Sequence, residues 1–187
     1  MTTSFFGLVG TNGAGKTEAC TYFEKQGYRA VSLSDEVRRE AAKLKRPLNR
    51  DSLVQTANEL KAKFGSDILA KRTVEMVQKL GVEKVVFDSI RHIDEIQILK
   101  KIGTRIIGIN APIQLRYERI KSRNRETDSI DFQTFIVHDR RENEGHSSGQ
   151  NIYACIKECE IVLENNGSAE ELYTKLAKYL KIQSNTK

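Results

Sequence analysis

Short apolar runs recur along the chain, each bounded by glycine or by polar residues. Runs of this kind are typical of strands that are buried on both faces of a parallel sheet. The pattern predicts strands at Ser4–Val9, Arg29–Leu33, Val82–Phe87, Arg105–Ile109 and Ile161–Leu163.

Amphipathic segments separate these runs and predict helices, because their apolar residues recur every three or four positions. Ser34 is expected to be the N-cap of one helix, and Ser168 with Glu171 predicts a capping box for the last one. Strands that alternate with helices predict an α/β fold with three layers and a mostly parallel five-stranded sheet. The predicted helices lie near Lys16–Gln26, Ser34–Lys45, Leu53–Phe64, Ser66–Leu80, Ile93–Lys101, Ile113–Ile120, Phe132–Ile136 and Ser168–Lys181.

The length and composition indicate a single domain that spans residues 1–187. The hydrophobic fraction of 39% is enough to form one core. No apolar run approaches the roughly 20 residues of a membrane helix, and the N-terminus has no signal or transit features. The three cysteines, Cys20, Cys155 and Cys159, form no disulfide framework. We therefore expect a cytoplasmic protein that does not engage a membrane.

A glycine-rich loop lies between the first predicted strand and the first predicted helix. It matches the phosphate-loop pattern G-x-x-x-x-G-K-S/T. Its glycines let backbone N–H groups face the phosphates, and the helix N-terminus adds a positive dipole. Lys16 is expected to bridge the β- and γ-phosphates of ATP, and Thr17 to hold Mg²⁺. The alternative is an ordinary glycine turn with an accidental lysine. The loop consists of Gly10, Thr11, Asn12, Gly13, Ala14, Gly15, Lys16 and Thr17.

Other large classes of phosphate-loop protein do not fit the rest of the chain. A GTPase carries D-x-x-G after the third strand, whereas Ser89-Ile90-Arg91 follows Asp88 here, and N-K-x-D is absent. The chain is also short for a helicase. These exclusions favour a kinase-like protein.

Charged residues follow the second and third predicted strands, where ligands bind in open α/β folds. Asp88 is a candidate to hold Mg²⁺ through water, although it could instead cap the next helix. Arg91, Asp35 and Arg38 are candidates to contact the phosphate acceptor. Asp35 and Arg38 could equally form a solvated ion pair, since they lie three positions apart.

An arginine-rich segment concentrates part of the net charge of +6. Arg116, Arg119 and Arg123 are spaced to share one helix face. Phosphoryl transfer needs such cations, because negative charge spreads over the oxygens of the transferred group. The alternative is a basic solvent face paired with nearby acids, among them Glu118, Glu126 and Glu142. Further arginines flank a polar stretch that could close as a lid and exclude water, namely Arg125, Arg140 and Arg141.

Taken together, these motifs resemble the nucleoside-monophosphate-kinase group of phosphate-loop proteins. The similarity is greatest to adenylate-kinase-related proteins best known from archaea, with dephospho-CoA kinases and phage deoxynucleoside-monophosphate kinases nearby. It covers nearly the whole chain. It rests on Gly10–Thr17, Ser34-Asp35, Asp88–Arg91, Ala111-Pro112, Arg116–Ile120, Arg123 with Arg125, Asp131-Phe132 with Phe135, and Asn165–Ser168.

The resemblance implies an ATP- and Mg²⁺-dependent phosphotransferase acting on a nucleoside or deoxynucleoside monophosphate. It implies a helical acceptor-binding insert at residues 34–80 and a lid-like segment at residues 124–150. The positions of Asp35, Arg38 and Arg91 then line the acceptor site, with Arg140 added from the lid. Arg119 and Arg123 serve the transferred phosphate. The turn at Asn166 and Gly167 lies beside the donor adenine.

Two departures leave the acceptor open. Related sequences usually have Asp-Gly where Asp88-Ser89 stands, and residues 142–150 are not a standard adenylate-kinase lid. A dephospho-CoA kinase is an alternative, with Asp35 as the base for a sugar hydroxyl. A nucleotide-dependent regulatory or nucleic-acid-binding module is a second alternative. No aromatic residue lies between Arg119 and Arg125, so nucleic acid is not the expected partner. Cys155 and Cys159 could form half of a zinc site, but buried apolar roles are favoured.

Overall fold

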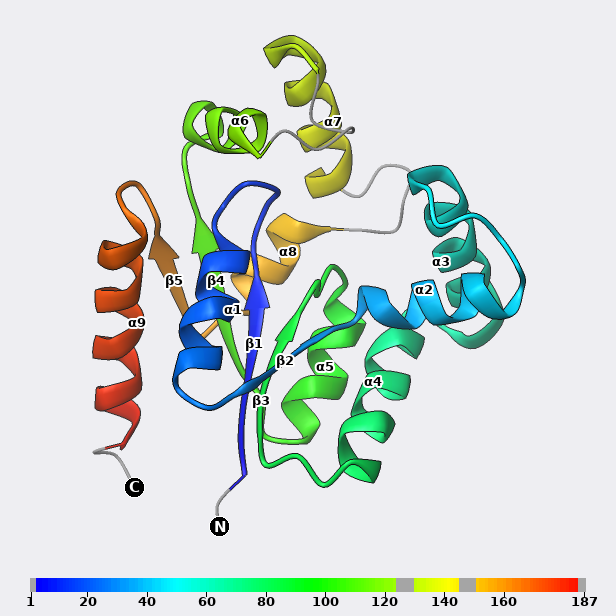
Figure 1. The fold of residues 1–187 in the computed structure, drawn as a ribbon, viewed down its shortest axis with the longest axis horizontal. Coiled ribbons are helices and arrows are strands. Elements are labelled where there is room, and N and C mark those ends of the chain that lie inside the picture. Colours follow the sequence, from blue (N-terminus) through cyan, green and yellow to red (C-terminus); the bar gives the residue numbers. More distant parts are fainter. Residues whose placement is uncertain (1–2, 124–129, 145–150, 185–187) are drawn as a thin grey trace.

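The protein is described by a computed structural model that covers residues 3–123, 130–144 and 151–184 (Figure 1). Its strands are β1 (Ser4–Val9), β2 (Arg29–Ser32), β3 (Lys84–Asp88), β4 (Arg105–Asn110) and β5 (Ile161–Glu164). They form one sheet in the order β2-β3-β1-β4-β5, and every adjacent pair is parallel. All carboxyl ends of the strands therefore meet at one edge.

The central strand is apolar on both faces because helices cover both sides of the sheet. Phe6 and Leu8 face helices α1 (Lys16–Lys25) and α9 (Ala169–Ser184), whose Phe23 and Leu176 complete that layer. Val9 packs into the opposite layer. That layer contains α2 (Ser34–Lys43), α3 (Arg50–Phe64), α4 (Ile68–Lys79), α5 (Ile93–Lys101) and α8 (Ile152–Lys157). The two apolar clusters explain why strands at the sheet centre read as continuous apolar runs.

Two further helices lie over the carboxyl edge of the sheet (Figure 1). These are α6 (Ile113–Ser122) and α7 (Phe132–Glu144). Tyr117 of α6 packs its ring against Phe132 and Phe135 of α7, with centroids 5.1 and 5.6 Å apart. The Tyr117 hydroxyl also donates to the carbonyl of Ile130 at 3.0 Å. The described part of the predicted lid is thus a helix docked on its neighbour; residues 124–129 and 145–150 lie outside the described residues.

The predicted α/β fold with three layers and five strands is confirmed. The observed starts of some helices differ from the predicted ones where a tertiary contact outweighs the local sequence pattern. Ser34 is the first residue of α2 rather than its N-cap. The cap position is taken by Leu33, which is buried in the core and has no polar side-chain atom to make a cap bond. Asn49 instead caps α3, and its Oδ1 accepts from the backbone N–H of Ser52 at 3.0 Å. At the last helix one of the two bonds of the predicted capping box is present: Ser168 Oγ accepts from the N–H of Glu171 at 3.3 Å.

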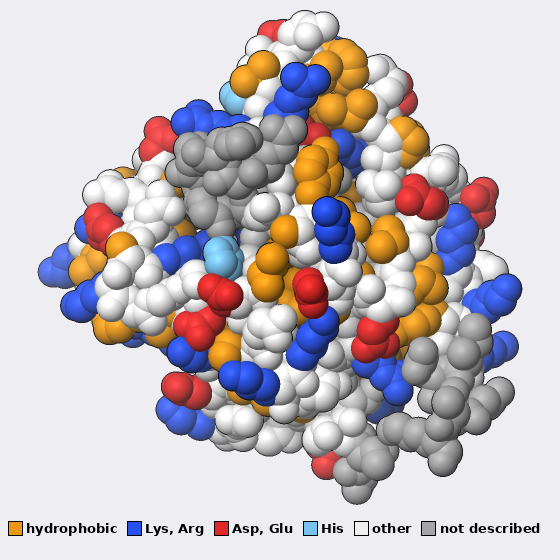
Figure 2. All heavy atoms as spheres, turned by 180° about the vertical axis from the view of Figure 1, so that it is seen from behind, with side chains coloured by type: hydrophobic (Ala, Val, Ile, Leu, Met, Phe, Trp, Pro, Cys, Tyr) orange, Lys and Arg blue, Asp and Glu red, His pale blue; other side chains and the backbone are white. Residues whose placement is uncertain are grey.

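The surface carries charges of both signs. Figure 2 shows Lys and Arg side chains interspersed with Asp and Glu over the described part of the rear face. The net charge of +6 is therefore not gathered into one basic surface on that face. Among the described residues, no helix combines the length and the apolar character needed to cross a membrane.

Candidate active site

The phosphate loop joins the central strand β1 to the N-terminus of α1, at the carboxyl edge of the sheet. Gly13 and Gly15 adopt φ angles of 79° and 108°, which side chains rarely tolerate. A Cβ at Gly13 would lie 2.7 Å from the carbonyl oxygen of Arg116, and one at Gly15 would collide with the amide of Asn165. Both glycines are required because the loop is packed tightly against α6 and against the turn after β5.

Asn165 holds the loop from one side. Its buried amide donates from Nδ2 to the carbonyl of Ala14 at 2.8 Å, and its own N–H donates to the carbonyl of Asn110 at 2.7 Å. A single residue at the end of β5 therefore ties the phosphate loop to the end of β4. The sequence pattern indicated a role only for the following Asn166 and Gly167, and nothing in it pointed to the contact of Asn165 with the loop.

Arg116 holds the loop from the other side. Its Nη1 donates to the carbonyl of Asn12 at 3.2 Å, and its Nε to that of Ala111 at 3.0 Å. The guanidinium also makes a two-point ion pair with Asp139 of α7, at 2.5 and 2.8 Å, and both residues are about 95% buried (4% and 5% exposed). The predicted row of three arginines on one face is therefore wrong at Arg116, because the α7 carboxylate draws it into the interior.

Lys16 lies in the loop with its ammonium folded back onto it. Nζ donates to the carbonyls of Gly10 and Thr11 at 2.8 and 3.0 Å. The pKa of Lys16 is lowered to about 8, mainly by burial and additionally by Arg91, while the carboxylates of Asp88 and Glu142 oppose the shift. The ammonium is thus incompletely compensated, which favours an anion as an additional partner.

Asp88 ends β3 beside this lysine. Its Oδ1 is buried without a hydrogen-bond partner, while Oδ2 accepts from the Ser89 hydroxyl at 3.4 Å. Asp88 does not cap α5, since His92 occupies that position and accepts from the N–H of Asp94 at 3.2 Å. The alternative role as a cap is therefore wrong. Among the described residues Oδ1 of this carboxylate has no partner, and the carboxylate lies close enough to Lys16 to act on its ammonium; it suits a hard cation such as Mg²⁺, which binds few protein ligands.

Ser89 occupies the position where related sequences usually have glycine. Its φ is 64°, in the left-handed region, and its hydroxyl accepts from the Ser32 hydroxyl at 3.0 Å. The backbone shape that glycine adopts freely is thus retained by a serine anchored through hydrogen bonds.

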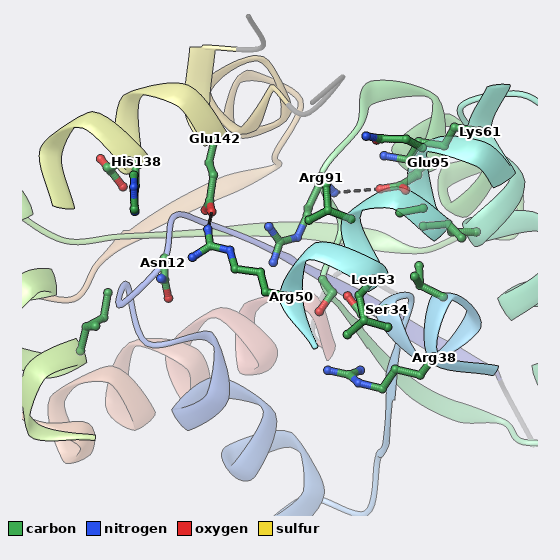
Figure 3. Close-up of a pocket in the computed structure, with 18 of the residues that line it drawn as sticks. Asn12, Ser34, Arg38, Arg50, Leu53, Lys61, Arg91, Glu95, His138 and Glu142 are labelled. Atoms are coloured by element: carbon green, nitrogen blue, oxygen red, sulfur yellow. Dashed lines mark hydrogen bonds and ion pairs between the residues drawn. The ribbon is translucent and has the colours of Figure 1, made fainter. Parts of the chain in front are cut away.

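A cavity of about 470 Å³ opens beside the phosphate loop; we call it the arginine cavity (Figure 3). It lies between the loop, the α2–α4 helices and α7. Its cationic lining consists of Arg38, Arg50, Lys61, Arg91 and Arg123. Its apolar lining includes Val37, Leu53, Val54, Ala57, Leu69 and Phe135.

The structure brings some of the predicted residues together here. Arg38 and Arg91 line the arginine cavity, and Arg123 approaches Asn12 with Nη2 3.5 Å from its Oδ1. Asp35 does not line it, and its carboxylate forms the expected ion pair with Arg38 at 2.8 Å. That pair is half-exposed.

Other predicted residues lie elsewhere. Arg119 donates from Nη2 to the carbonyl of Gly167 at 3.0 Å, while its Nη1 is buried without a partner. It therefore lies at the turn expected beside the donor base rather than in the arginine cavity. Arg140 is exposed on α7 and is not among the residues that line the cavity, because Asp139 occupies the inward face of the helix. Arg125 lies outside the described residues.

Several residues of the site were missed by sequence reasoning. Arg50 and Glu142 form an ion pair at 2.8 Å between α3 and α7. Glu95 is buried on the cavity wall and accepts from the N–H groups of Arg91 and His92 at 2.8 and 3.1 Å. Burial raises the pKa of Glu95, against the lowering effect of Lys61. These residues belong to ordinary-looking amphipathic helices, so their spacing carried no signal.

No protein-family model matches this chain. The UPF0200 protein TK1334 of Thermococcus kodakarensis is 30% identical over 177 residues, which cover 91% of this chain and 93% of that protein. The chain belongs to the UPF0200 family. A second UPF0200 protein, MMP1282 of Methanococcus maripaludis, is 36% identical over 139 residues, or 73% of this chain and 76% of that protein.

Solved structures share the fold of this UPF0200 chain. TT1252 from Thermus thermophilus has a TM-score of 0.66 at 20% identity and covers 97% of this chain and 98% of that one. Shikimate kinase from Bacteroides thetaiotaomicron has a TM-score of 0.59 at 12% identity, covering 95% and 98%. The fold is therefore that of phosphate-loop kinases. The narrower resemblance to adenylate-kinase-related proteins stays a prediction.

Proposed function

We propose that this UPF0200 protein transfers a phosphoryl group from ATP, with Mg²⁺, to a nucleoside or deoxynucleoside monophosphate. One observation carries the proposal: a phosphate loop with an undercompensated Lys16 opens beside a cavity lined by arginines. A donor phosphate chain and an anionic acceptor are the two ligands that such neighbouring cationic sites suit best.

The donor side is proposed to use the phosphate loop. Its backbone N–H groups would surround the phosphates, and the Lys16 ammonium would exchange its loop carbonyls for phosphate oxygens. Thr17 and Asp88 are the residues proposed to hold Mg²⁺, which when bound neutralises phosphate charge. The residues proposed to contact ATP are Gly10, Thr11, Asn12, Gly13, Ala14, Gly15, Lys16, Thr17, Asn166 and Gly167.

Two arginines are proposed to serve the transfer itself. Arg119 joins the turn at Gly167, and its unpartnered Nη1 is available to a nucleotide. Arg123 lies between the phosphate loop and the arginine cavity, at Asn12. A guanidinium in that place would stabilise charge that develops between donor and acceptor.

On the acceptor side we propose Arg38 and Arg91, with Asp35 orienting Arg38 through their ion pair. Arg140 is not retained, because it does not line the cavity in this arrangement. Asp35 is paired with Arg38 and does not itself line the cavity. This position disfavours the alternative role of Asp35 as a base for a sugar hydroxyl. An acceptor that is already anionic needs no such base.

ATP binding is expected to weaken above about pH 8. The pKa of Lys16 in the free protein is about 8, and a bound phosphate raises it by favouring the ammonium. Between those two values binding takes up a proton, so the affinity should fall by up to about tenfold per pH unit as the pH rises. Below about pH 7, Lys16 is charged in both states and contributes no slope.

Calorimetric titration with a non-hydrolysable ATP analogue and Mg²⁺ between about pH 7.5 and 9.5 measures this dependence. The Lys16→Met variant should bind weakly with a flat profile. An equal slope in the variant would assign the effect to another group.

The function itself is tested by ADP release in a coupled assay with ATP, Mg²⁺ and a panel of ribo- and deoxynucleoside monophosphates. We expect at least one acceptor to stimulate release above the basal rate in a saturable way. Stimulation by dephospho-CoA alone would select the alternative kinase. ATP binding without stimulation by any acceptor, together with salt-sensitive binding of RNA or DNA, would select a regulatory or nucleic-acid-binding module.

A further inference from the structure

The Arg50–Glu142 ion pair joins two helices that are distant in the sequence and lies in the arginine cavity. Nη2 of Arg50 in α3 and Oε1 of Glu142 in α7 are 2.8 Å apart, and both residues line the cavity. The pair is partly solvated, with side-chain exposures of 53% and 28%. An ion pair of this kind contributes little to stability, so its position in the cavity calls for a different explanation.

Glu142 brings its carboxylate to a place surrounded by cations. Figure 3 shows Glu142 reaching from α7 toward the tip of Arg50, while the Arg91 guanidinium points to the same region from the β3–α5 connection. The Glu142 carboxylate is also close enough to act on the ammonium of Lys16, whose pKa it raises against the effect of burial. Groups from the donor loop and from the cavity thus both interact with this one carboxylate.

We propose that Arg50 and Arg91 form the subsite for the phosphate monoester of the acceptor, and that Glu142 occupies this subsite until the phosphate displaces it. The proposal rests on the proposed function for the identity of the acceptor. A carboxylate and a phosphate present similar pairs of oxygens to the planar fork of arginine, so one can replace the other. The bound dianion would gain Arg50 and would repel the released Glu142.

The apolar side of the cavity indicates what the phosphate is attached to. Val37 of α2, together with Leu53 and Ala57 of α3, lines the same cavity as the two arginines. A ligand with a phosphate at one end and a flat, mostly apolar group at the other satisfies both parts. A nucleoside monophosphate has this form, whereas inorganic phosphate has only the charged end.

The test measures binding of AMP to the full chain by calorimetry, without ATP, in the native protein and in Glu142→Gln. Loss of the intramolecular competitor and of its repulsion should tighten AMP binding by about tenfold. Glu75→Gln is the matched control, because Glu75 is exposed on α4, outside the cavity lining, and the same charge is removed. It should leave the affinity unchanged. Adenosine, which lacks the phosphate, should bind equally to native protein and Glu142→Gln.

Two further measurements connect the gain to Arg50 and to phosphate. Arg50→Gln should weaken AMP binding, and in that background Glu142→Gln should produce a smaller gain. Inorganic phosphate is titrated with the ATP analogue already bound, so that the donor loop is filled and phosphate binding reports the acceptor subsite. Glu142→Gln should tighten this binding as well, which covers acceptors other than AMP.

The inference is overturned if Glu142→Gln tightens neither AMP nor phosphate, or if adenosine gains as much as AMP. It is also overturned if Glu142→Gln abolishes turnover at unchanged affinity, since Glu142 would then act as a base. Failure of the proposed function has a different signature: no monophosphate stimulates ADP release in the coupled assay, while Glu142→Gln still tightens AMP binding.

Discussion

Lys16→Ala is expected to lower kcat/KM for ATP in phosphotransfer by at least about 10³-fold while the fold is retained. The ammonium lies at the N-terminus of α1 and is the group of the phosphate loop that can neutralise donor phosphates by direct charge. Removing one such stabilising group in a desolvated site costs about 10²–10³ in rate, and the loss of donor affinity adds to it. Single-turnover rates at saturating ATP separate the two effects.

Retention of the fold is expected for a specific reason. Within the described part of the chain, Nζ of Lys16 bonds only to loop carbonyls, and burial of its charge already disfavours the ammonium. Circular dichroism and a denaturation curve check this in the same preparation. Lys79→Ala, at the exposed end of α4, removes an equal charge and should keep native rates. Near-native turnover in Lys16→Ala would show that this lysine does not stabilise the donor phosphates during transfer.

Asp139→Ala is expected to lower the free energy of unfolding by about 3–5 kcal/mol, because it leaves a buried guanidinium without its partner. Arg116 is 4% exposed and makes both of its strongest contacts with Asp139. The same guanidinium bonds to the carbonyl of Asn12, so ATP affinity should fall as well. Urea denaturation and titration with the ATP analogue measure the two losses.

The double variant Arg116→Met with Asp139→Leu provides the comparison. It removes both charges and fills the space with apolar side chains, which often restores stability. We expect it to be more stable than Asp139→Ala and still impaired in ATP binding, because the bond to Asn12 is lost. If Asp139→Ala were as stable as the native protein, the buried pair would not be what docks α7 onto α6.

Features that depend on neighbouring residues were predictable from the sequence. The apolar runs of β1 and β4 are long enough to signal strands, since both faces are covered. The phosphate loop was predictable because its glycines, Lys16 and Thr17 are consecutive. The position of Asp88 at the end of β3 followed from the apolar run before it, which places it at the edge where the loop lies.

Features that depend on packing between distant segments were not predictable. Arg116, Arg119 and Arg123 are spaced to lie on one helix face, so the sequence does not distinguish them. Arg116 differs because Asp139 of α7 pairs with it in the interior. Asn165 follows β5, and nothing local distinguishes it from Asn166. Arg50 and Glu142 meet across 92 residues of chain, so neither pattern nor propensity relates them.

The two anchors of the phosphate loop have a consequence for the rate and order of ligand capture. Asn165 and Arg116 hold the loop from two sides through hydrogen bonds within the protein itself. The conformational entropy of the loop is therefore lost during folding. ATP can then bind to it quickly and with little rearrangement of the protein. At the acceptor subsite, Glu142 must first leave Arg50, which slows binding of the acceptor there. In a mixture of both ligands the triphosphate would consequently arrive first.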